Sequence, residues 1–186
     1  MIGLFFYIGT LLIELLFFFF FSIIAVFLIY SSIKGSPYVP TKSADIDLIL
    51  KNAQIKKDQV FLDLGCGDGR VVRQAAKKYG AYGIGIDINL LMIYWAQFLA
   101  KLTHTISVEF KVMDIVSQKL PKADVVYIFL MPKLIEKIKP KLKNYLDNKC
   151  LIISHGFYIK GFNQYCIKKI DGNPFGTFFY RISEDI

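Results

Sequence analysis

The first 33 residues form an apolar segment, and this segment constrains the fold of the chain more than any other feature. It contains no Lys or Arg and one acid, Glu14, and 26 of its 33 residues are A, V, I, L, M, F, W, Y or C. Leu15 to Ile33 is a run of 19 residues without a charge, which as a helix would span about 28 Å, close to the hydrocarbon thickness of a bilayer. The segment therefore predicts one transmembrane helix.

Two other interpretations of this segment fit less well. A cleavable signal peptide needs basic residues before a shorter apolar run and a small-residue cleavage site after it, and the sequence has neither. A helix this apolar on all sides would not stay soluble on a small domain. Positive charge begins at Lys34 and Lys42, so the positive-inside rule predicts a single-pass membrane protein with its domain in the cytoplasm. Glu14 would lie at the interface if the span began at Leu15, but at depth if the helix began at Ile2.

The rest of the chain has the composition of one basic globular domain. The whole chain combines a mean hydropathy of +0.43 with a net charge of +8, but all 23 basic residues lie after position 33. About 48% of the remaining 153 residues are hydrophobic, an ordinary globular value that excludes disordered and collagen-like classes. The three cysteines and two histidines show no metal-ligand spacing, so no metal site is expected. We expect an anchor over 1–33, a Pro-containing linker over 34–42 and a domain over 43–186.

The domain alternates short apolar strands with amphipathic helices, which is typical of a parallel sheet covered on both faces. Ser43 and Asn89 can cap two helices, Pro132 can open another, and Pro140 would bend or end that last one. The pattern predicts a doubly wound α/β fold with a mostly parallel, seven-stranded, Rossmann-like sheet that ends in an antiparallel hairpin. The strands are expected at Val60–Leu64, Tyr82–Ile86, Ser107–Val112, Asp124–Leu130, Leu151–Ser154, Gln164–Ile170 and Gly176–Ile182.

The first of these strands ends in a glycine-rich loop, Asp63-Leu-Gly-Cys-Gly-Asp-Gly-Arg70. In doubly wound sheets ligands bind at the carboxyl ends of the strands. The loop has the spacing G-x-G-x-G, with Arg70 where the dinucleotide fingerprint G-x-G-x-x-G requires its third glycine. No G-x-x-x-x-G-K-[ST] phosphate loop occurs in the chain. Asp63 would repel a pyrophosphate but attract an ammonium group, so the loop indicates a ligand without phosphate.

Acidic residues also follow the second and third strands. Asp87 lies 22 residues beyond Gly65, where a carboxylate can accept hydrogen bonds from both ribose hydroxyls. Asp114 follows the third strand and is positioned to accept from an adenine amino group. A ligand with an amine, a ribose and an adenine but no phosphate is S-adenosylmethionine (SAM). Three acids in register with three strand ends therefore predict a SAM site.

At these residues the sequence resembles the class I SAM-dependent methyltransferases. The segments Pro37–Thr41, Asp63–Arg70 and Asp124–Pro132 narrow the resemblance to the protein-lysine methyltransferases that act on the ATP synthase c subunit and the adenine nucleotide translocase. Members of that family also carry an apolar segment ahead of the domain. The resemblance implies that Tyr38–Thr41 lies over the bound cofactor. The residues expected to bind SAM are Asp63, Gly65, Cys66, Gly67, Asp87, Ile88, Asp114 and Thr41.

The resemblance implies methylation of a lysine in a membrane protein. One departure concerns the acceptor side, because Ser154–Phe157 does not match the Arg- and Pro-containing segment of the family. Two alternatives stay open: a methyltransferase for a lipid, quinone or other small molecule, and a non-catalytic SAM-binding membrane module. Nucleic acid is disfavoured, because Leu130-Met-Pro132 stands where amino-methylating enzymes have Asn or Asp, two prolines and an aromatic residue. The sequence names no general base; His155 is the nearest candidate.

Overall fold

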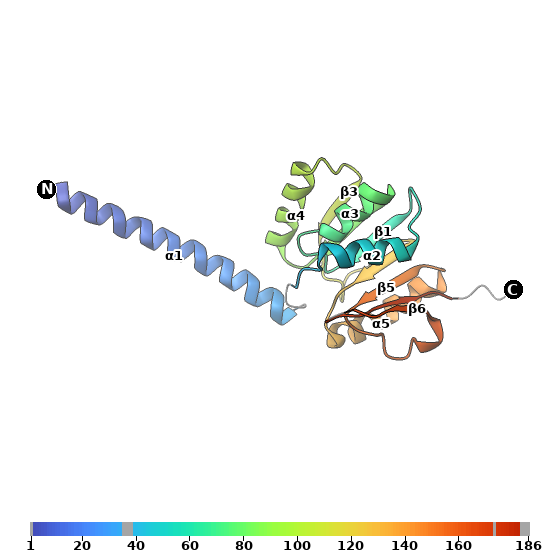
Figure 1. Cartoon of the computed structure of the whole chain (residues 1–186). Helices are drawn as coiled ribbons and strands as arrows, with labels where there is room; N and C mark the ends of the chain where they lie inside the picture. The colour runs from blue at the N-terminus through green and yellow to red at the C-terminus, as the bar shows by residue number, and fades with distance from the viewer. Residues whose placement is uncertain (1, 35–38, 173, 183–186) are drawn as a thin grey trace.

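The computed structural model describes residues 2–34, 39–172 and 174–182. A long helix, α1 (Ile2–Lys34), precedes an α/β domain and extends away from it (Figure 1). Within α1, Gly3–Val26 is long and apolar enough to cross a membrane, and none of its most apolar 18-residue window is buried against the rest of the chain. The helix begins at Ile2, so Glu14 lies inside this stretch rather than at its end.

A seven-stranded sheet forms the centre of the domain, with the order β3-β2-β1-β4-β5-β7-β6. The first five strands are parallel to one another, and β7 pairs antiparallel with both β5 and β6. The doubly wound fold and its terminal hairpin are therefore confirmed. The strands are β1 (Val60–Leu64), β2 (Tyr82–Asp87), β3 (Val108–Val112), β4 (Val125–Ile128), β5 (Leu151–His155), β6 (Cys166–Ile170) and β7 (Thr177–Tyr180).

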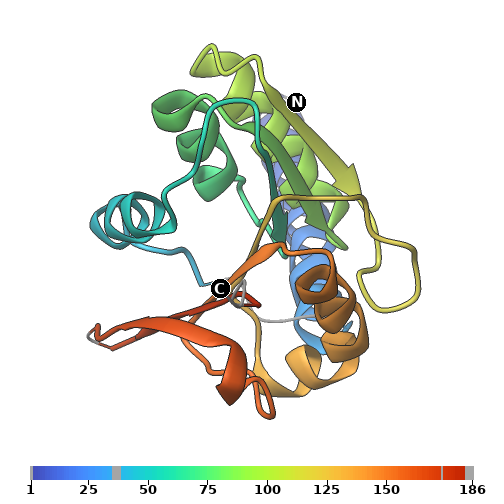
Figure 2. The same cartoon turned by 90° about the vertical axis from the view of Figure 1, so that its right-hand side faces the viewer.

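Helices cover both faces of this sheet (Figure 2). One face packs against α2, α3 and α4 through two apolar clusters that include Phe61 and Phe110. The other face packs against α5 through a cluster that includes Leu62 and Ile138. Alternate residues of each strand thus face opposite layers, which explains why the strands are almost entirely apolar. The helices are α2 (Ser43–Ala53), α3 (Arg70–Tyr79), α4 (Leu90–Leu102) and α5 (Pro132–Asp147), and a short 3-10 helix covers Asn163–Tyr165.

The structure corrects two expectations about helix ends. Ser43 is the first residue of α2 rather than its cap; Lys42 holds the N-cap position and its side chain makes no capping hydrogen bond. Helix α5 does not end at Pro140 but continues to Asp147. Pro140 is exposed, while Ile138 and Leu142 on either side of it are fully buried. Apolar packing on both sides of Pro140 therefore keeps the helix continuous.

Other expectations about caps hold. Asn89 caps α4, because its side-chain oxygen accepts from the amides of Leu91 at 3.0 Å and Met92 at 3.3 Å. Pro132 stands in the first turn of α5.

Candidate active site

Asp63 lies at the carboxyl end of β1, in the middle of the sheet. It pairs in register with Gly85 of β2 and Tyr127 of β4, and its exposure is 2%. Burial, and then the nearby carboxylates of Asp87 and Asp68, raise the pKa of Asp63 well above its usual range. A cationic ligand stabilises the charged form of a buried carboxyl group that lies beside two others, because the cation offsets both the desolvation and the repulsion.

The glycine loop that follows β1 is held against the end of β2. The amides of Gly65 and Cys66 both donate to the carbonyl of Ile86, at 2.8 and 2.9 Å. Gly65 has a φ of +85°, and a Cβ added to it would lie 2.7 Å from Cδ2 of Leu130. Only glycine fits this position, because the left-handed backbone is strained for other residues and the space is filled. The loop thus brings its backbone close to the carboxyl ends of β1, β2 and β4.

The Cys66 side chain does not point into the loop's open side. It packs with Val72, Ile93 and Phe110 in a buried apolar cluster, and burial raises the pKa of the Cys66 thiol well above its usual range. The thiol is therefore neutral and structural. Cys66 can contact a ligand at this site only through its backbone.

Asp87 connects the glycine loop to the start of α4. Its Oδ2 accepts from the amide of Gly67 at 3.0 Å, and its Oδ1 accepts from the amide of Asn89 at 2.8 Å. Burial raises the pKa of Asp87 from its usual value, although these amide hydrogen bonds act in the opposite direction. Ile88, half-buried, lies between Asp87 and the capping Asn89. The carboxylate is thereby fixed at the carboxyl end of β2.

Asp114 follows β3, at the carboxyl edge of the sheet, but it is already engaged in a local turn. Its Oδ1 accepts from the amide of Val116 at 2.8 Å and its Oδ2 from the hydroxyl of Ser117 at 2.9 Å. These hydrogen bonds, chiefly that from Val116, lower the pKa of Asp114, so it is ionised near neutral pH. A carboxylate has about four lone-pair sites, which leaves room for one more donor such as an exocyclic amine.

Thr41 is brought to the same end of the sheet by contacts that no local sequence pattern predicts. Its buried hydroxyl lies 3.1 Å from the hydroxyl of Tyr127, and its carbonyl accepts from Nη1 of Arg70 at 3.3 Å. Arg70 also forms an ion pair of 2.9 Å with Asp68, which is 6% exposed. The Asp68–Arg70 pair therefore ties the chain ahead of α2 to the glycine loop. Tyr38, expected in the same place, lies outside the described residues.

An aromatic cluster lies on the other side of Asp63, beyond the ends of β4 and β5. The ring of Phe129 meets the ring of His155 edge-on at 4.6 Å and that of Phe175 at 5.2 Å. His155 is buried, and its Nδ1 lies 2.9 Å from the hydroxyl of Thr177. Burial lowers the pKa of His155, so the ring is neutral near pH 7. His155 is thus fixed in the sheet, whereas Phe129 and Phe175 are half-buried and keep part of their rings exposed.

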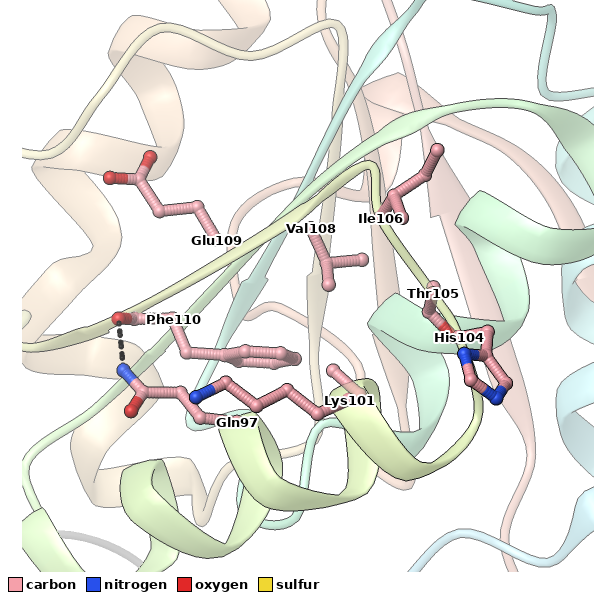
Figure 3. Close-up of a pocket in the computed structure, with 9 residues that line it drawn as sticks. Gln97, Lys101, His104, Thr105, Ile106, Val108, Glu109 and Phe110 are labelled. Atoms are coloured by element: carbon pink, nitrogen blue, oxygen red, sulfur yellow. Dashed lines mark hydrogen bonds between the residues drawn. The ribbon is translucent and has the colours of Figure 1, made fainter.

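A separate groove of about 540 Å³ lies between α4 and the edge strand β3 (Figure 3). It is lined by His104, Thr105, Val108 and Phe110, among others, so it opens toward the amino end of β3. The acidic residues after β1, β2 and β3 lie at the opposite end of the sheet. The groove is therefore not the site to which those residues point.

The residues at the strand ends fit SAM in charge and in shape. The carboxyl groups of Asp63, Asp68 and Asp87 lie together. Two arginines are near them: Arg70 forms an ion pair with Asp68, and Arg73 donates to the carbonyl of Asp68. Acidic groups therefore outnumber basic ones, which suits a ligand with a sulfonium and an ammonium group. The loop at Gly65 has no room for a side chain, as close approach of a ligand to backbone requires. Within the described residues no group of three His, Cys, Asp or Glu side chains could hold a metal ion.

Known proteins resemble this chain over most of the domain. It is 34% identical to a protein-lysine N-methyltransferase of Saccharolobus islandicus over 80% of this chain and 94% of that protein. It is 27% identical to the human lysine N-methyltransferase of the ATP synthase c-subunit over 65% of this chain, but spans only 52% of that protein. The crystal structure of an RNA methyltransferase from Salinibacter ruber with S-adenosyl-L-homocysteine superposes with a TM-score of 0.72 and 31% identity, covering 80% of this chain and 96% of that one.

The family model for the ANTKMT methyltransferase domain matches residues 63–166, from the buried acid of β1 to the start of β6. This range contains the glycine loop and the acids after β2 and β3. The chain therefore belongs to the ANTKMT family of class I SAM-dependent methyltransferases.

Proposed function

We propose that this protein is a membrane-anchored enzyme that transfers a methyl group from SAM to a lysine of a membrane protein. The observation that carries the proposal is the short distance along the chain between two features. The apolar helix α1 ends at Lys34, and Thr41 is held at the carboxyl end of the sheet through Tyr127. Seven peptide units span at most about 25 Å, so the methyl-transfer site stays close to any membrane that α1 crosses.

We assign the cofactor contacts as follows. Asp63 faces the ammonium group, Asp87 accepts from the ribose hydroxyls, and Asp114 accepts from the adenine amino group. Ile88 lies beside the adenine. Gly65, Cys66 and Gly67 contribute backbone only, and Thr41 closes the site from the side of the linker. The fixed carboxylate of Asp87, and the three acidic groups gathered around Asp63, support this arrangement.

SAM supplies an activated methyl group on a sulfonium, which passes to the amine in one in-line displacement and leaves S-adenosylhomocysteine. The residues of this chain mainly align donor and acceptor, an effect worth about 7–11 kcal/mol in well-oriented systems. The attacking lysine must be neutral, although its free pKa is near 10.4. The half-buried rings of Phe129 and Phe175 offer an apolar place for it, where desolvation lowers the pKa of an amine.

His155 is not assigned as the base. Its ring is buried and its Nδ1 is engaged with Thr177, so it serves to hold β5 against β7. The acceptor lysine therefore loses its proton to water at the mouth of the site before it attacks, and the methylammonium that forms keeps the positive charge received from the sulfonium.

The anchor favours an acceptor in the same membrane. A tethered enzyme meets membrane-bound acceptors at a raised effective concentration without any extra contact. Positive charge begins at Lys34 and Lys42, directly after the apolar segment, which supports a domain on the cytoplasmic side. On this proposal residues 1–33 are the anchor, 34–42 the linker and 43–186 the enzyme.

The test supplies membranes with methyl-labelled SAM and compares the full-length wild type with Asp63→Asn. The proposal expects label in a small membrane protein, recovered after acid hydrolysis as methyl-lysine and absent with the variant. Asp171→Asn, a change of the same kind at an exposed surface acid, should label as wild type does. Label in the organic extract would replace this function by lipid or quinone methylation, and label in RNA by nucleic-acid methylation. Binding of SAM without turnover on any fraction would leave only a SAM-binding module.

A further inference from the structure

The outward face of α4 carries a row of large apolar side chains spaced i, i+4, i+7 and i+11, which places them on one side of the helix. These four residues are between 37% and 63% exposed. The rings of two of them stack with their centroids 5.4 Å apart. We call this row the α4 outer face: Leu91, Trp95, Phe98 and Leu102.

The core does not require this row. The inward face of α4 is made of Ile93, Ala96 and Ala100, which are buried against the cluster around Phe110. The outer face points the opposite way, so it contributes nothing to that cluster. Large apolar side chains gathered on one exposed face mark a surface that another apolar body covers.

The position of α1 in the chain indicates that a lipid bilayer lies within reach of the α4 outer face. Thr41 is fixed to the domain through Tyr127, and seven peptide units separate it from the end of α1 at Lys34. In Figure 1, α1 lies on the same side of the domain as α4. A bilayer crossed by α1 therefore meets the domain on the side where α4 lies.

The composition of the row and its surroundings suits a lipid interface. Trp and Phe are typical of helices that lie at the level of the headgroups, and Tyr94, 60% exposed, adds an amphipathic ring beside the row. Lys101 is exposed on the same helix, where its ammonium group can reach phosphate groups while its stem lies on apolar surface. Exposed Lys42 and Lys133, at the carboxyl edge of the sheet, add positive charge near an anionic surface.

We propose that the α4 outer face inserts into the boundary between headgroups and acyl chains of the same bilayer that α1 spans. This inference rests on the membrane anchoring in the proposed function. It gives the domain a second point of attachment to the membrane, and therefore a fixed orientation relative to the bilayer. The N-cap of α4 is Asn89, and its amide donates to Asp87. Docking of α4 therefore fixes the cofactor site relative to the membrane plane. An acceptor lysine must then lie near the membrane surface rather than far out in the cytoplasm.

The chain contains one tryptophan, Trp95, which makes the proposal directly measurable. The full-length protein is reconstituted into vesicles of phosphatidylcholine and phosphatidylglycerol, with or without lipids brominated at shallow acyl positions. The proposal expects Trp95 emission to shift to the blue, to lose intensity with brominated lipid, and to become less accessible to acrylamide than in detergent. Shielding from acrylamide without quenching by lipid would mean that protein covers the face and would overturn the proposal. Full accessibility to acrylamide would overturn it as well.

A pair of double variants separates docking from anchoring. Leu91→Ser with Leu102→Ser removes half of the outer face and keeps Trp95 stacked on Phe98, so quenching by brominated lipid should fall sharply. Leu48→Ser with Ile167→Ser changes two side chains of similar exposure elsewhere on the surface and should leave the quenching unchanged. Equal quenching in the two double variants would contradict the proposal.

Three further readings in the same samples identify which proposal has failed. Flotation of the protein with the vesicles reports the anchor, S-adenosylhomocysteine binding reports the fold, and methyl-lysine formation reports the proposed function. If flotation, S-adenosylhomocysteine binding and methyl-lysine formation are all intact while Trp95 is not quenched, only the docking proposal is wrong. The proposed function fails alone if Trp95 is quenched and S-adenosylhomocysteine binds, but no lysine is methylated.

Discussion

The amide of Gly67 donates a hydrogen bond of 3.0 Å to Oδ2 of Asp87, so the loop after β1 and the end of β2 are joined by one carboxylate. The other oxygen of Asp87 accepts from the amide of Asn89, the cap of α4. The carboxylate is thereby held by backbone on both sides before any cofactor arrives. In the proposed cofactor site Asp87 binds the ribose, and a carboxylate that is already fixed loses little freedom on binding, which favours affinity.

The first prediction concerns this carboxylate. Asp87→Asn keeps one acceptor oxygen but replaces the other by a donor, which opposes either the Gly67 amide or the ribose hydroxyls. A hydrogen bond to a charged group is worth about 1.5–3 kcal/mol, so SAM should bind about 10- to 100-fold more weakly by calorimetry. Asp124→Asn is the control, because Asp124 accepts from the Val60 amide at 2.7 Å at the other end of β1. If both variants bound SAM as wild type does, Asp87 would not be a cofactor residue.

The second prediction separates stability from binding at Asp63. Its pKa is raised in the folded protein by burial and by Asp87 and Asp68, so the folded state holds this proton more tightly than the unfolded state. Without ligand, its contribution to the free energy of unfolding falls as pH rises from the ordinary Asp pKa through the raised one. Asn does not titrate, so in the Asp63→Asn variant the free energy of unfolding does not fall with rising pH at this position.

The variant should therefore be more stable than ligand-free wild type near neutral pH, by a margin that shrinks as the pH is lowered. Urea unfolding at several pH values measures the margin. In the same variant SAM affinity should fall, because the amide cannot pair with an ammonium group. A variant less stable than wild type at neutral pH would show that Asp63 is held by interactions other than those assigned to it.

The third prediction compares two glycines with nearly equal backbone angles. Gly65 and Gly161 have φ of +85° and +84°, so alanine costs about 1–2 kcal/mol of backbone strain at either position. At Gly161 the nearest atom to an added Cβ is the mobile Nζ of Lys139, at 3.3 Å. At Gly65 it is Cδ2 of the buried Leu130, at 2.7 Å.

Gly161→Ala should thus lower the melting temperature without changing SAM affinity. Gly65→Ala should lower both, and should lower the melting temperature further. Thermal unfolding and calorimetry with S-adenosylhomocysteine measure the two effects. Equal behaviour of the two variants would mean that the loop at Gly65 does not line the cofactor site.

The parts of this fold that the sequence predicts well are those set by local chemistry. The apolar strands, the glycine loop and the Asn89 cap each follow from residue type at a fixed spacing, and the structure contains all three. Pro140 shows where local rules fail. A proline predicts a bend or an end, but the buried residues Ile138 and Leu142 keep α5 continuous, and tertiary packing is not visible in a local pattern.

The candidate site also combines features that follow from local sequence with contacts that depend on tertiary packing. The positions of Asp63, Asp87 and the glycines at one edge of the sheet were predictable, because parallel strands bring their carboxyl ends to the same edge. The contacts of Thr41 with Tyr127 and Arg70 were not predictable, since they join residues 86 and 29 positions apart. The apolar residues on either side of Tyr127 indicate a core strand and give no sign of a contact with Thr41. The Asp-x-Arg spacing of Asp68 and Arg70 was the one local signal of the ion pair that supports this contact.

The last prediction concerns the attachment of the linker to the domain. The hydroxyls of Thr41 and Tyr127 lie 3.1 Å apart and both residues are buried, and burial raises the pKa of Tyr127, so its hydroxyl stays protonated. Thr41→Val and Tyr127→Phe should each cost about 1–3 kcal/mol of stability, because each leaves a buried hydroxyl without its partner. The double variant should cost less than the two single costs together, since no orphaned hydroxyl remains.

Urea unfolding of the three variants gives the coupling between the two residues. Val60→Ala with Ile170→Ala, two half-buried positions that are not partners in the sheet register, provides an additive comparison. Methylation of membrane protein should also slow in the single variants more than SAM binding weakens, because a loosened Thr41 lengthens the tether and lets the site turn away from the membrane. Additive costs for Thr41 and Tyr127 would show that this contact does not hold the linker in place.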